Sequence, residues 1–504
     1  MGETGNRDTK QVSLFSVFYY ILSGDETMIY DVLIVGAGVT GGMLARELSK
    51  YRLDICLLEK ENDVSCGASK ANSGIIHGGY DPVPGTQKAR LNIAGVPLLY
   101  EAAKQLNVPV LNNGSMVAAF GKEEERVLEK LYQRGLENGV AGMAILSGEE
   151  ARALEPNLSP EITGVLFVPS AGIICPYELT IAAVGNAMDN GVTLKCNFEV
   201  TEIKKKDGLF TVKAKNGTFV TGKYLVNCAG AYSDKIAEMA DDKFFEIIPR
   251  AGEYMLLDKT EGTRVSHTIF QVPTKEGKGI LVTPTVDGNL LTGPTANAVA
   301  APDEKQTTPS GMETVLRLAA KSVPTISFRQ VITSFCGVRA SEKNGDFIIE
   351  ASKQIPSLVH VAAIDSPGLS SCVSIAKMVV NILGRNGLKL CLRDDWNGKR
   401  EDPHAFRKMN DDEKNEYIKK HPQYGKIVCR CETVSEGEIC DAIRRNPPAH
   451  DIDGMKRRTR SGMGRCQGGF CAPYVMKLLA RENGTSMEMI TKKGGNSTMI
   501  NGRL

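Results

Sequence analysis

The fold of this chain is decided by the stretch MIYDVLIVGAGVTGGMLARELSK, residues 28–50. An apolar, β-branched run leads into a G-x-G-x-x-G turn made of Gly36, Gly38 and Gly41, and a helix-like segment follows. The next strand-like run, DICLLEK (54–60), carries Glu59 at its end. Such glycines let the backbone approach a pyrophosphate, the helix N-terminus offers unpaired N–H groups, and the acid can accept hydrogen bonds from ribose hydroxyls. The pattern therefore predicts a dinucleotide-binding unit. A chance glycine turn in another α/β fold is the alternative.

Length and composition limit the number of domains, the class of partner and the cellular compartment that we expect. A chain of 504 residues is too long for one compact core, so we expect two or three domains. Lys and Arg number 61 against 59 Asp and Glu, which gives no broad basic face and argues against nucleic acid as a partner. The cysteines number 13, and most stand singly in apparent core strands, which favours a reducing cytoplasm over a disulfide framework.

The first 27 residues contain VSLFSVFYYIL (12–22), which is similar to the apolar region of a short signal peptide. No A-x-A cleavage site follows it, and it is too short to span a bilayer. We interpret Met28 as the natural start and residues 1–27 as a disordered extension, with a weak membrane-surface anchor as the alternative.

The remaining chain alternates strand-like and helix-like segments. Residues 198–230 predict hairpin strands with glycine-containing turns, and residues 245–335 predict a largely antiparallel region. Residues 394–423 are highly charged and poor in apolar side chains, which is typical of a linker or a solvated helix.

Three further segments resemble the D-amino-acid-oxidase-like FAD superfamily. YLVNCAGAYSDKIA (224–237) and IDSPGLSSCVSIAKMV (364–379) are similar to its other nucleotide-contacting segments, and SKANSGIIHGGY (69–80) is similar to its flavin-adjacent loop. The sequence contains no second G-x-G-x-x-G that would indicate a separate NAD site. The wide spacing of Cys56 and Cys66 argues against a disulfide reductase. The resemblance implies FAD as the cofactor, and both non-covalent and covalent attachment stay open. It implies cofactor contacts by the glycine turn, Glu59, Lys60, Ser69, Ser73, Val200, Ala229, Gly230, Gly368, Leu369 and Ser370.

Within that superfamily, SGIIHGGY (73–80) and SFCGVRAS (334–341) resemble motifs of FAD-dependent glycerol-3-phosphate dehydrogenases and of the related L-2-hydroxyglutarate oxidases. Oxidation of a secondary alcohol needs a base for the hydroxyl proton, and an anionic substrate needs a fixed cation. His77 stands in a glycine-flanked loop and suits the base. Arg339 stands in a small, apolar stretch and suits the anion. The alternatives are a structural histidine and an internal salt bridge.

Four cysteines gather near the C-terminus with the spacing C-x-C, then 34 residues, then C-x4-C: Cys429, Cys431, Cys466 and Cys471. Zinc sites usually repeat wider C-x2-4-C pairs, whereas a 2Fe–2S cluster takes four thiolates at varied spacing. Residues 426–481 resemble the bacterioferritin-associated-ferredoxin-like 2Fe–2S domain in CRCETV (429–434) and RTRSGMGRCQGGFC (458–471). Many members of that family have only two residues between the cysteines of the second pair, whereas this chain has four. A zinc site and a vestigial domain without metal therefore stay open as alternatives. Ser435 and Glu438 predict a helix-capping pair between the two motifs.

Together these features predict an α/β (α+β overall) protein. A Rossmann-like FAD-binding domain (about 28–95, 165–240 and 336–390) is interleaved with an antiparallel-sheet substrate domain (about 96–164 and 241–335) within residues 28–393. A linker (394–423), a small helical 2Fe–2S domain (424–485) and a tail (486–504) follow.

The flavin–cluster combination resembles the large subunit of anaerobic glycerol-3-phosphate dehydrogenases. The resemblance implies a small anionic hydroxy substrate and a redox partner subunit, either a flavoprotein or a quinone-linked membrane subunit. The protein would then be cytoplasmic, or peripheral at the inner face of the membrane. The alternatives are an L-2-hydroxyglutarate (2-hydroxy acid) dehydrogenase or oxidase and a non-catalytic redox subunit.

Overall fold

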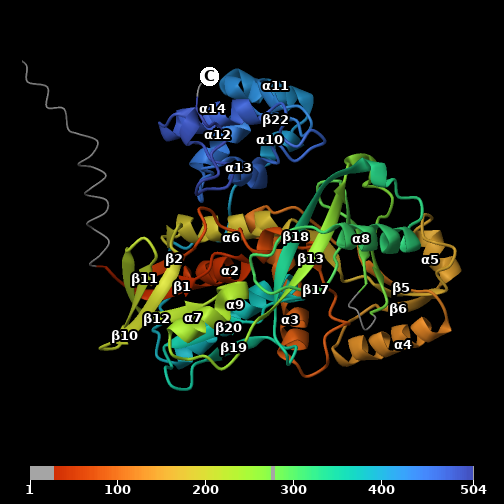
Figure 1. Cartoon of the computed structure of the whole chain (residues 1–504), viewed down its shortest axis with the longest axis horizontal. Helices are drawn as coiled ribbons and strands as arrows, with labels where there is room; N and C mark the ends of the chain where they lie inside the picture. The colour runs from red at the N-terminus through yellow and green to blue at the C-terminus, as the bar shows by residue number, and fades with distance from the viewer. Residues whose placement is uncertain (1–27, 274–278, 503–504) are drawn as a thin grey trace, which may run out of the picture.

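The structure is a computed structural model that describes residues 28–273 and 279–502. The extension expected at residues 1–27 lies outside the described residues. Two sheets stand side by side, and a small helical unit formed by the C-terminal residues sits above the first of them (Figure 1). None of the described helices is both long and apolar enough to cross a membrane.

The first sheet has eight strands and carries the predicted dinucleotide turn. Strand β1 (Ile29–Val35) pairs in parallel with β2 (Ile55–Leu58) on one side and with β12 (Phe219–Asn227) on the other. The expected hairpins are β10 (Val200–Lys206), β11 (Leu209–Ala214) and β12, which pair antiparallel. The sheet is completed by β9 (Thr193–Lys195), β19 (Ile348–Ala351) and β20 (Leu358–Ala362).

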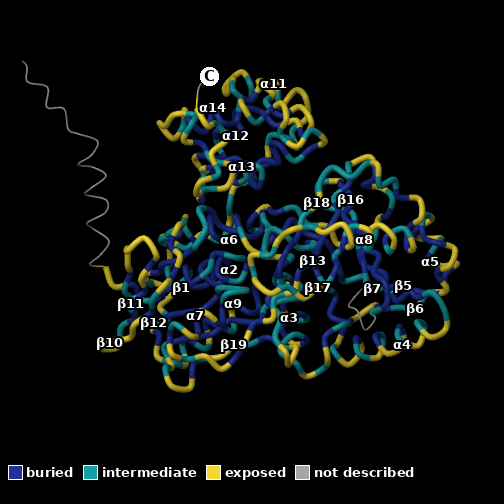
Figure 2. Tube along the Cα trace, in the orientation of Figure 1, coloured by how far each residue is buried: buried dark blue, intermediate teal, exposed yellow. Residues whose placement is uncertain are grey.

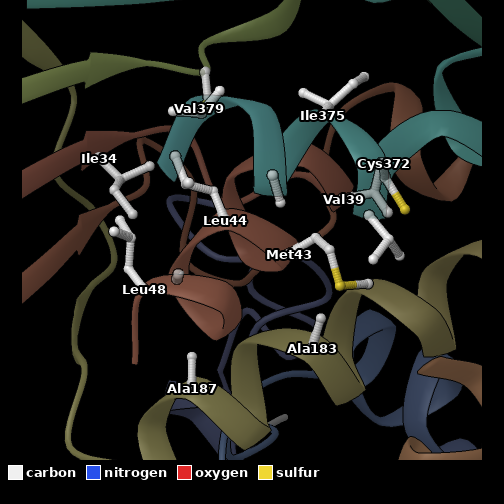
Figure 3. Packing of buried hydrophobic residues seen from close by; sticks show 14 of the residues in the cluster. Ile34, Val39, Met43, Leu44, Leu48, Ala183, Ala187, Cys372, Ile375 and Val379 are labelled. Atoms are coloured by element: carbon white, nitrogen blue, oxygen red, sulfur yellow. The ribbon is translucent and has the colours of Figure 1, made fainter. Parts of the chain in front are cut away.

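Helices bury the apolar faces of this sheet. Helix α2 (Val39–Leu48) lies between α9 (Gly368–Arg385) and α6 (Pro176–Asp189), and α3 (Gln87–Leu106) packs beside α9. Figure 3 shows Met43 and Leu44 of α2 among side chains of α9 and α6, such as Ile375 and Ala183, all buried. Helix α7 (Ser233–Met239) follows β12 and packs with the hairpin strands.

The second sheet has nine strands and is mostly antiparallel, as predicted for residues 245–335. Its path is β17 (Asn297–Ala298), β13 (Ile248–Leu257), β16 (Leu290–Gly293), β15 (Leu281–Pro284), β14 (Thr268–Gln271), β5 (Ser115–Ala119), β7 (Gly164–Val168) and β6 (Ala144–Ser147). The long strand β18 (Val331–Ser341) pairs antiparallel with β13 along its length. Helices α4 (Lys122–Glu137), α5 (Gly148–Leu154) and α8 (Pro309–Ser322) cover this sheet, whose strands are largely buried (Figure 2).

A small third sheet connects the two. It consists of β3 (Ile75–Ile76), β8 (Gly172–Ile174) and β4 (Val110–Leu111), all antiparallel. Because β3 precedes His77 directly, this sheet fixes where that side chain enters the space between the two larger sheets.

The C-terminal unit has its own core of buried side chains. A short hairpin of β21 (Ile427–Cys429) and β22 (Val434–Ser435) leads into α12 (Glu436–Arg444), α13 (Ile452–Thr459) and α14 (Ala472–Asn483). Ser435 and Glu438 form the predicted capping box at the start of α12. The charged segment 394–423 forms α10 (Ala405–Lys408) and α11 (Asp411–Lys420), and Ile490 of the expected tail is buried in the core of the unit.

Candidate active site and cluster site

A cavity of about 1040 Å³ runs from the carboxyl ends of β1 and β2 to the paired strands β13 and β18. Both predicted catalytic side chains, His77 and Arg339, line it. It is also lined by the predicted cofactor contacts Gly36, Gly38, Glu59, Lys60, Ser69, Ser73, Val200, Ala229, Gly230, Gly368 and Leu369. Segments far apart in the sequence therefore meet in one elongated space.

The glycine turn has the close contacts that its residues predict. Gly36 has a φ of +105°, and a Cβ there would lie 2.4 Å from the carbonyl oxygen of Cys228. At Gly41 a Cβ would lie 1.9 Å from the carbonyl oxygen of Gly36. Gly41 is absent from the cavity wall, so its part is to let helix α2 pack against the turn, while Gly36 and Gly38 face the cavity.

The adenosine end of the cavity is marked by Glu59, which is 8% exposed. One carboxylate oxygen accepts from the backbone N–H of Ala37 at 2.8 Å, and the other accepts from the N–H of Glu61 at 3.0 Å. Burial raises the pKa of this carboxyl, and the two N–H groups oppose that effect. The Ser69 hydroxyl accepts from the N–H of Val39 at 2.8 Å, at the first turn of α2. An acid, a tight glycine turn and a helix N-terminus in one long cavity fit FAD.

On the side of the cavity near Phe270, both backbone polar groups of His77 form hydrogen bonds. Its N–H donates to the Ser370 hydroxyl at 2.8 Å, and its carbonyl accepts from the side-chain amide of Asn92 at 2.9 Å. The ring stacks on Phe270 with centroids 5.9 Å apart, and Nε2 lies 3.2 Å from the Ser366 hydroxyl. Ser370 is fully buried and absent from the cavity wall, so in this structure it positions His77.

Arg339 extends from β18 across the neighbouring strand β13. Its Nη2 donates to the carbonyl oxygen of Thr295 at 3.4 Å, and a Cβ at Gly252 would lie 2.8 Å from the same nitrogen. Gly252 therefore leaves the space in which the guanidinium lies. Burial raises the pKa of the adjacent Tyr254, while Arg339 and Ser73 oppose that effect. Among the described residues, no carboxylate forms an ion pair with Arg339.

The four C-terminal cysteines form two pairs. The sulfur atoms of Cys431 and Cys466 are 3.5 Å apart at the surface, whereas Cys429 and Cys471 are buried. The Cys471 thiol and nearby backbone N–H groups lower the pKa of Cys429 to about 5. Within residues 28–273 and 279–502, no three His, Cys, Asp or Glu side chains are grouped around a single metal ion. Two thiol pairs suit a two-iron cluster, which takes four cysteines, better than one zinc ion.

Backbone N–H groups surround these thiols. Burial alone would raise the pKa of the Cys466 thiol. The effect of burial is outweighed by hydrogen bonds from the backbone N–H groups of Phe470, Gly468 and Gly469 and from the Cys431 thiol, so the pKa is lowered. The Ser461 hydroxyl donates to the sulfur of Cys471 at 3.7 Å. Such donors stabilise thiolates, which are the form that binds iron.

Arginines of the C-terminal unit attach it to the FAD-binding sheet. Asp63, in the loop after β2, is 5% exposed and accepts from Arg457 at 2.5 Å and from Arg458 at 2.7 and 2.8 Å. These two guanidinium groups outweigh burial and lower the pKa of Asp63 to about 2. Arg460 makes a contact with the second sheet, pairing at 2.5 Å with Asp287 between β15 and β16, and it also pairs at 2.8 Å with Glu432 of its own unit.

Comparison with known proteins agrees with this geometry. The model of the FAD dependent oxidoreductase family (DAO) matches residues 31–382. The chain belongs to the FAD-dependent oxidoreductase family. The model of the BFD-like [2Fe-2S] binding domain matches residues 427–481 of this FAD-dependent oxidoreductase. FAD and a 2Fe–2S cluster are therefore its cofactors.

The chain of this oxidoreductase is similar in sequence or structure to three proteins of known name. The glycerol 3-phosphate dehydrogenase of Caloramator mitchellensis is 47% identical over 94% of this chain and 98% of its own length. The human mitochondrial L-2-hydroxyglutarate dehydrogenase is 28% identical over 70% of this chain and 89% of its own. The solved structure of dithionite-reduced L-alpha-glycerophosphate oxidase from Mycoplasma pneumoniae, with FAD bound, superposes with a TM-score of 0.71 at 34% identity. It covers 74% of this chain and 99% of that one.

Sequence reasoning missed several residues of the cavity wall of this oxidoreductase. Arg250 and Tyr254 lie on β13, Phe270 on β14, and Ser366 before α9. The alternation of β13 places Arg250, Gly252 and Tyr254 on one face, and this signal is readable from the sequence. Which face lines the cavity is not readable, because it depends on the pairing of β13 with β18.

Proposed function

We propose that this oxidoreductase is a dehydrogenase that oxidises sn-glycerol 3-phosphate to dihydroxyacetone phosphate. We propose further that the electrons leave through the 2Fe–2S cluster to a protein or quinone-linked acceptor. The observation that carries the proposal is that His77, stacked on Phe270 of the second sheet, and Arg339, from β18 of the same sheet, line one cavity whose wall also contains the glycine turn and Glu59. The 47% identical relative, a glycerol 3-phosphate dehydrogenase, supports the choice of substrate.

The chain's own side chains have separate parts in this proposal. Arg339 binds the anionic group of the substrate through its planar fork. His77 takes the hydroxyl proton, and Ser366 and Phe270 orient its ring. FAD, when bound, supplies the two-electron acceptor for the hydride of the same carbon, and the cluster supplies a one-electron carrier.

The second candidate substrate is L-2-hydroxyglutarate, or another 2-hydroxy acid. It too is an anion with a secondary alcohol, so His77 and Arg339 suit it, and the human relative of that activity supports it. For either substrate we place the protein in the cytoplasm, with any contact to a membrane made through a redox partner subunit.

An anaerobic absorbance titration of the purified holoprotein tests the proposal. Glycerol 3-phosphate is added first and L-2-hydroxyglutarate afterwards, while flavin and cluster bands are followed separately. Bleaching of both bands by glycerol 3-phosphate is the expected result. Bleaching by L-2-hydroxyglutarate alone would make the hydroxy acid the substrate in place of glycerol 3-phosphate. Bleaching by neither compound would favour a non-catalytic redox subunit. Flavin bleaching with unchanged cluster bands would contradict the electron route.

A further inference from the structure

Arg250 and Arg339 stand directly opposite each other on neighbouring antiparallel strands. In the register of β13 with β18, Arg250 pairs with Arg339, two positions before Gly252 pairs with Gly337. Directly opposed residues of an antiparallel pair share one face of the sheet. Both arginines line the cavity, so this shared face is its wall.

This pair is electrostatically unfavourable in the protein alone. Like charges directly opposite in a sheet destabilise it, and here no carboxylate among the described residues forms an ion pair with either guanidinium. Four lysines of the same cavity wall do have carboxylate partners: Lys60 with Glu61 at 3.4 Å, Lys88 with Asp365 at 2.5 Å, Lys235 with Glu238 at 3.6 Å and Lys305 with Asp303 at 3.6 Å. The two arginines are therefore arranged differently from those lysines and have donors left for an anion.

The two side chains also lie at different depths. Arg339 is half-buried and lies over Gly252, towards the Thr295 carbonyl and Tyr254. Arg250 is exposed while still lining the cavity, which places it at the open edge. An anion held by Arg339 would thus have Arg250 on its outer side, within the same wall.

We propose that Arg250 is the second cation of a two-arginine clamp that selects a phosphate group over a single carboxylate at this end of the cavity. The proposal rests on the proposed function and names its substrate class. A phosphate monoester carries a charge near −2 above pH 7 and three acceptor oxygens, so it can satisfy two guanidinium forks. One carboxylate carries −1 and leaves the opposed pair with an excess positive charge.

The test uses FAD-loaded protein with the variants Arg250→Gln and Arg250→Lys. Arg317→Gln, an exposed arginine on α8 outside the cavity wall, is the matched control. Binding of inorganic phosphate at pH 8 is followed by perturbation of the flavin spectrum, and steady-state constants are measured with glycerol 3-phosphate. We expect Arg250→Gln to weaken phosphate binding and raise KM by about tenfold to a hundredfold, with kcat changed less than about threefold. Arg250→Lys should lie between, and Arg317→Gln should match the wild type.

The same experiment distinguishes unfolding of the variant, failure of the clamp proposal and failure of the proposed function. Removing one of two opposed like charges should leave Tm unchanged or raise it, so a loss of binding would not reflect unfolding. Wild-type phosphate affinity in Arg250→Gln, or no phosphate binding by the wild type, would overturn the clamp. A wild-type protein that binds phosphate through Arg250 but whose flavin is not reduced by glycerol 3-phosphate would instead overturn the proposed function and leave the anion clamp standing.

Discussion

Replacing Asp63 by Asn should loosen the C-terminal unit from the FAD-binding sheet. The folded protein holds the pKa of Asp63 at about 2, against an ordinary value of 3.8, because Arg457 and Arg458 donate to it. At about 1.4 kcal/mol for each pH unit, this difference corresponds to about 2 kcal/mol of stability at neutral pH. Because the folded pKa is the lower one, this contribution is complete above pH 4 and is lost as the pH falls towards 2. Asn cannot carry the charge, and it leaves two buried guanidinium groups without a carboxylate, so the loss should be at least about 2 kcal/mol.

Limited proteolysis of the segment 394–423 measures this loosening, because cleavage by dilute trypsin follows the population of the opened state. A loss of about 2 kcal/mol predicts cleavage about thirtyfold faster at pH 7.5. The control is Asp394→Asn, which removes a carboxylate that is 93% exposed and paired with Arg52. Such a surface pair contributes about 0–1 kcal/mol, so the control should be cleaved less than about fivefold faster. If Asp63→Asn were cleaved no faster than this control, the buried clamp would not be what holds the unit.

Three further substitutions test the site. His77→Gln should slow flavin reduction by glycerol 3-phosphate about a hundredfold or more in stopped-flow traces, while phosphate still binds, because a base and not a binding group is removed; equal loss of binding would contradict this. Cys471→Ala should abolish cluster absorbance and bound iron and leave the flavin spectrum intact, whereas Cys440→Ala, a buried cysteine outside the two pairs, should keep its iron. Glu59→Gln should weaken FAD binding about tenfold in an equilibrium release assay, because a charged acceptor for the ribose becomes neutral; unchanged release would place the adenosine elsewhere.

The features predicted correctly from the sequence are those that local chemistry determines. The turn at Gly36 follows from backbone sterics within a few residues, and the capping box of Ser435 and Glu438 spans one helical turn. The hairpins of β10, β11 and β12 follow from alternation and turn residues. The charge of residues 394–423 predicts a linker or a solvated helix, and α11 within this segment has no buried residue.

The features that sequence reasoning missed depend on pairings between distant residues. The opposition of Arg250 and Arg339 joins positions on two strands separated by β14–β17 and α8, so no local pattern reveals it. The contact of Asp63 with Arg457 and Arg458 joins the loop after the second strand to a helix near the C-terminus. Ser370 stays a predicted cofactor contact, and its hydroxyl also accepts from the backbone N–H of His77, a distant contact that its motif does not reveal.

The placement of the two cysteine pairs bears on the proposed electron route. The buried pair, Cys429 and Cys471, is linked through Ser461 to the loop that contacts the FAD-binding unit, where Tyr177 of α6 donates to the sulfur of Met463 at 3.6 Å. Tyr177 follows Pro176, whose ring lies beside Gly74, three residues before His77. On this side, then, protein atoms are continuous between the thiols and the catalytic end of the cavity.

The other pair, Cys431 and Cys466, faces outward beside Phe470, which is 88% exposed. A cluster held by both pairs would be bound by two thiols buried in the core of the C-terminal unit and by two thiols closer to solvent. This asymmetry is what a carrier between an internal donor and an external protein acceptor requires, whereas delivery to a small oxidant such as oxygen requires no exposed cluster. The buried arginine contacts at Asp63 hold the C-terminal unit against the FAD-binding sheet, and the exposed pair stays open to solvent. We therefore expect the acceptor to approach the exposed pair and not the cavity mouth.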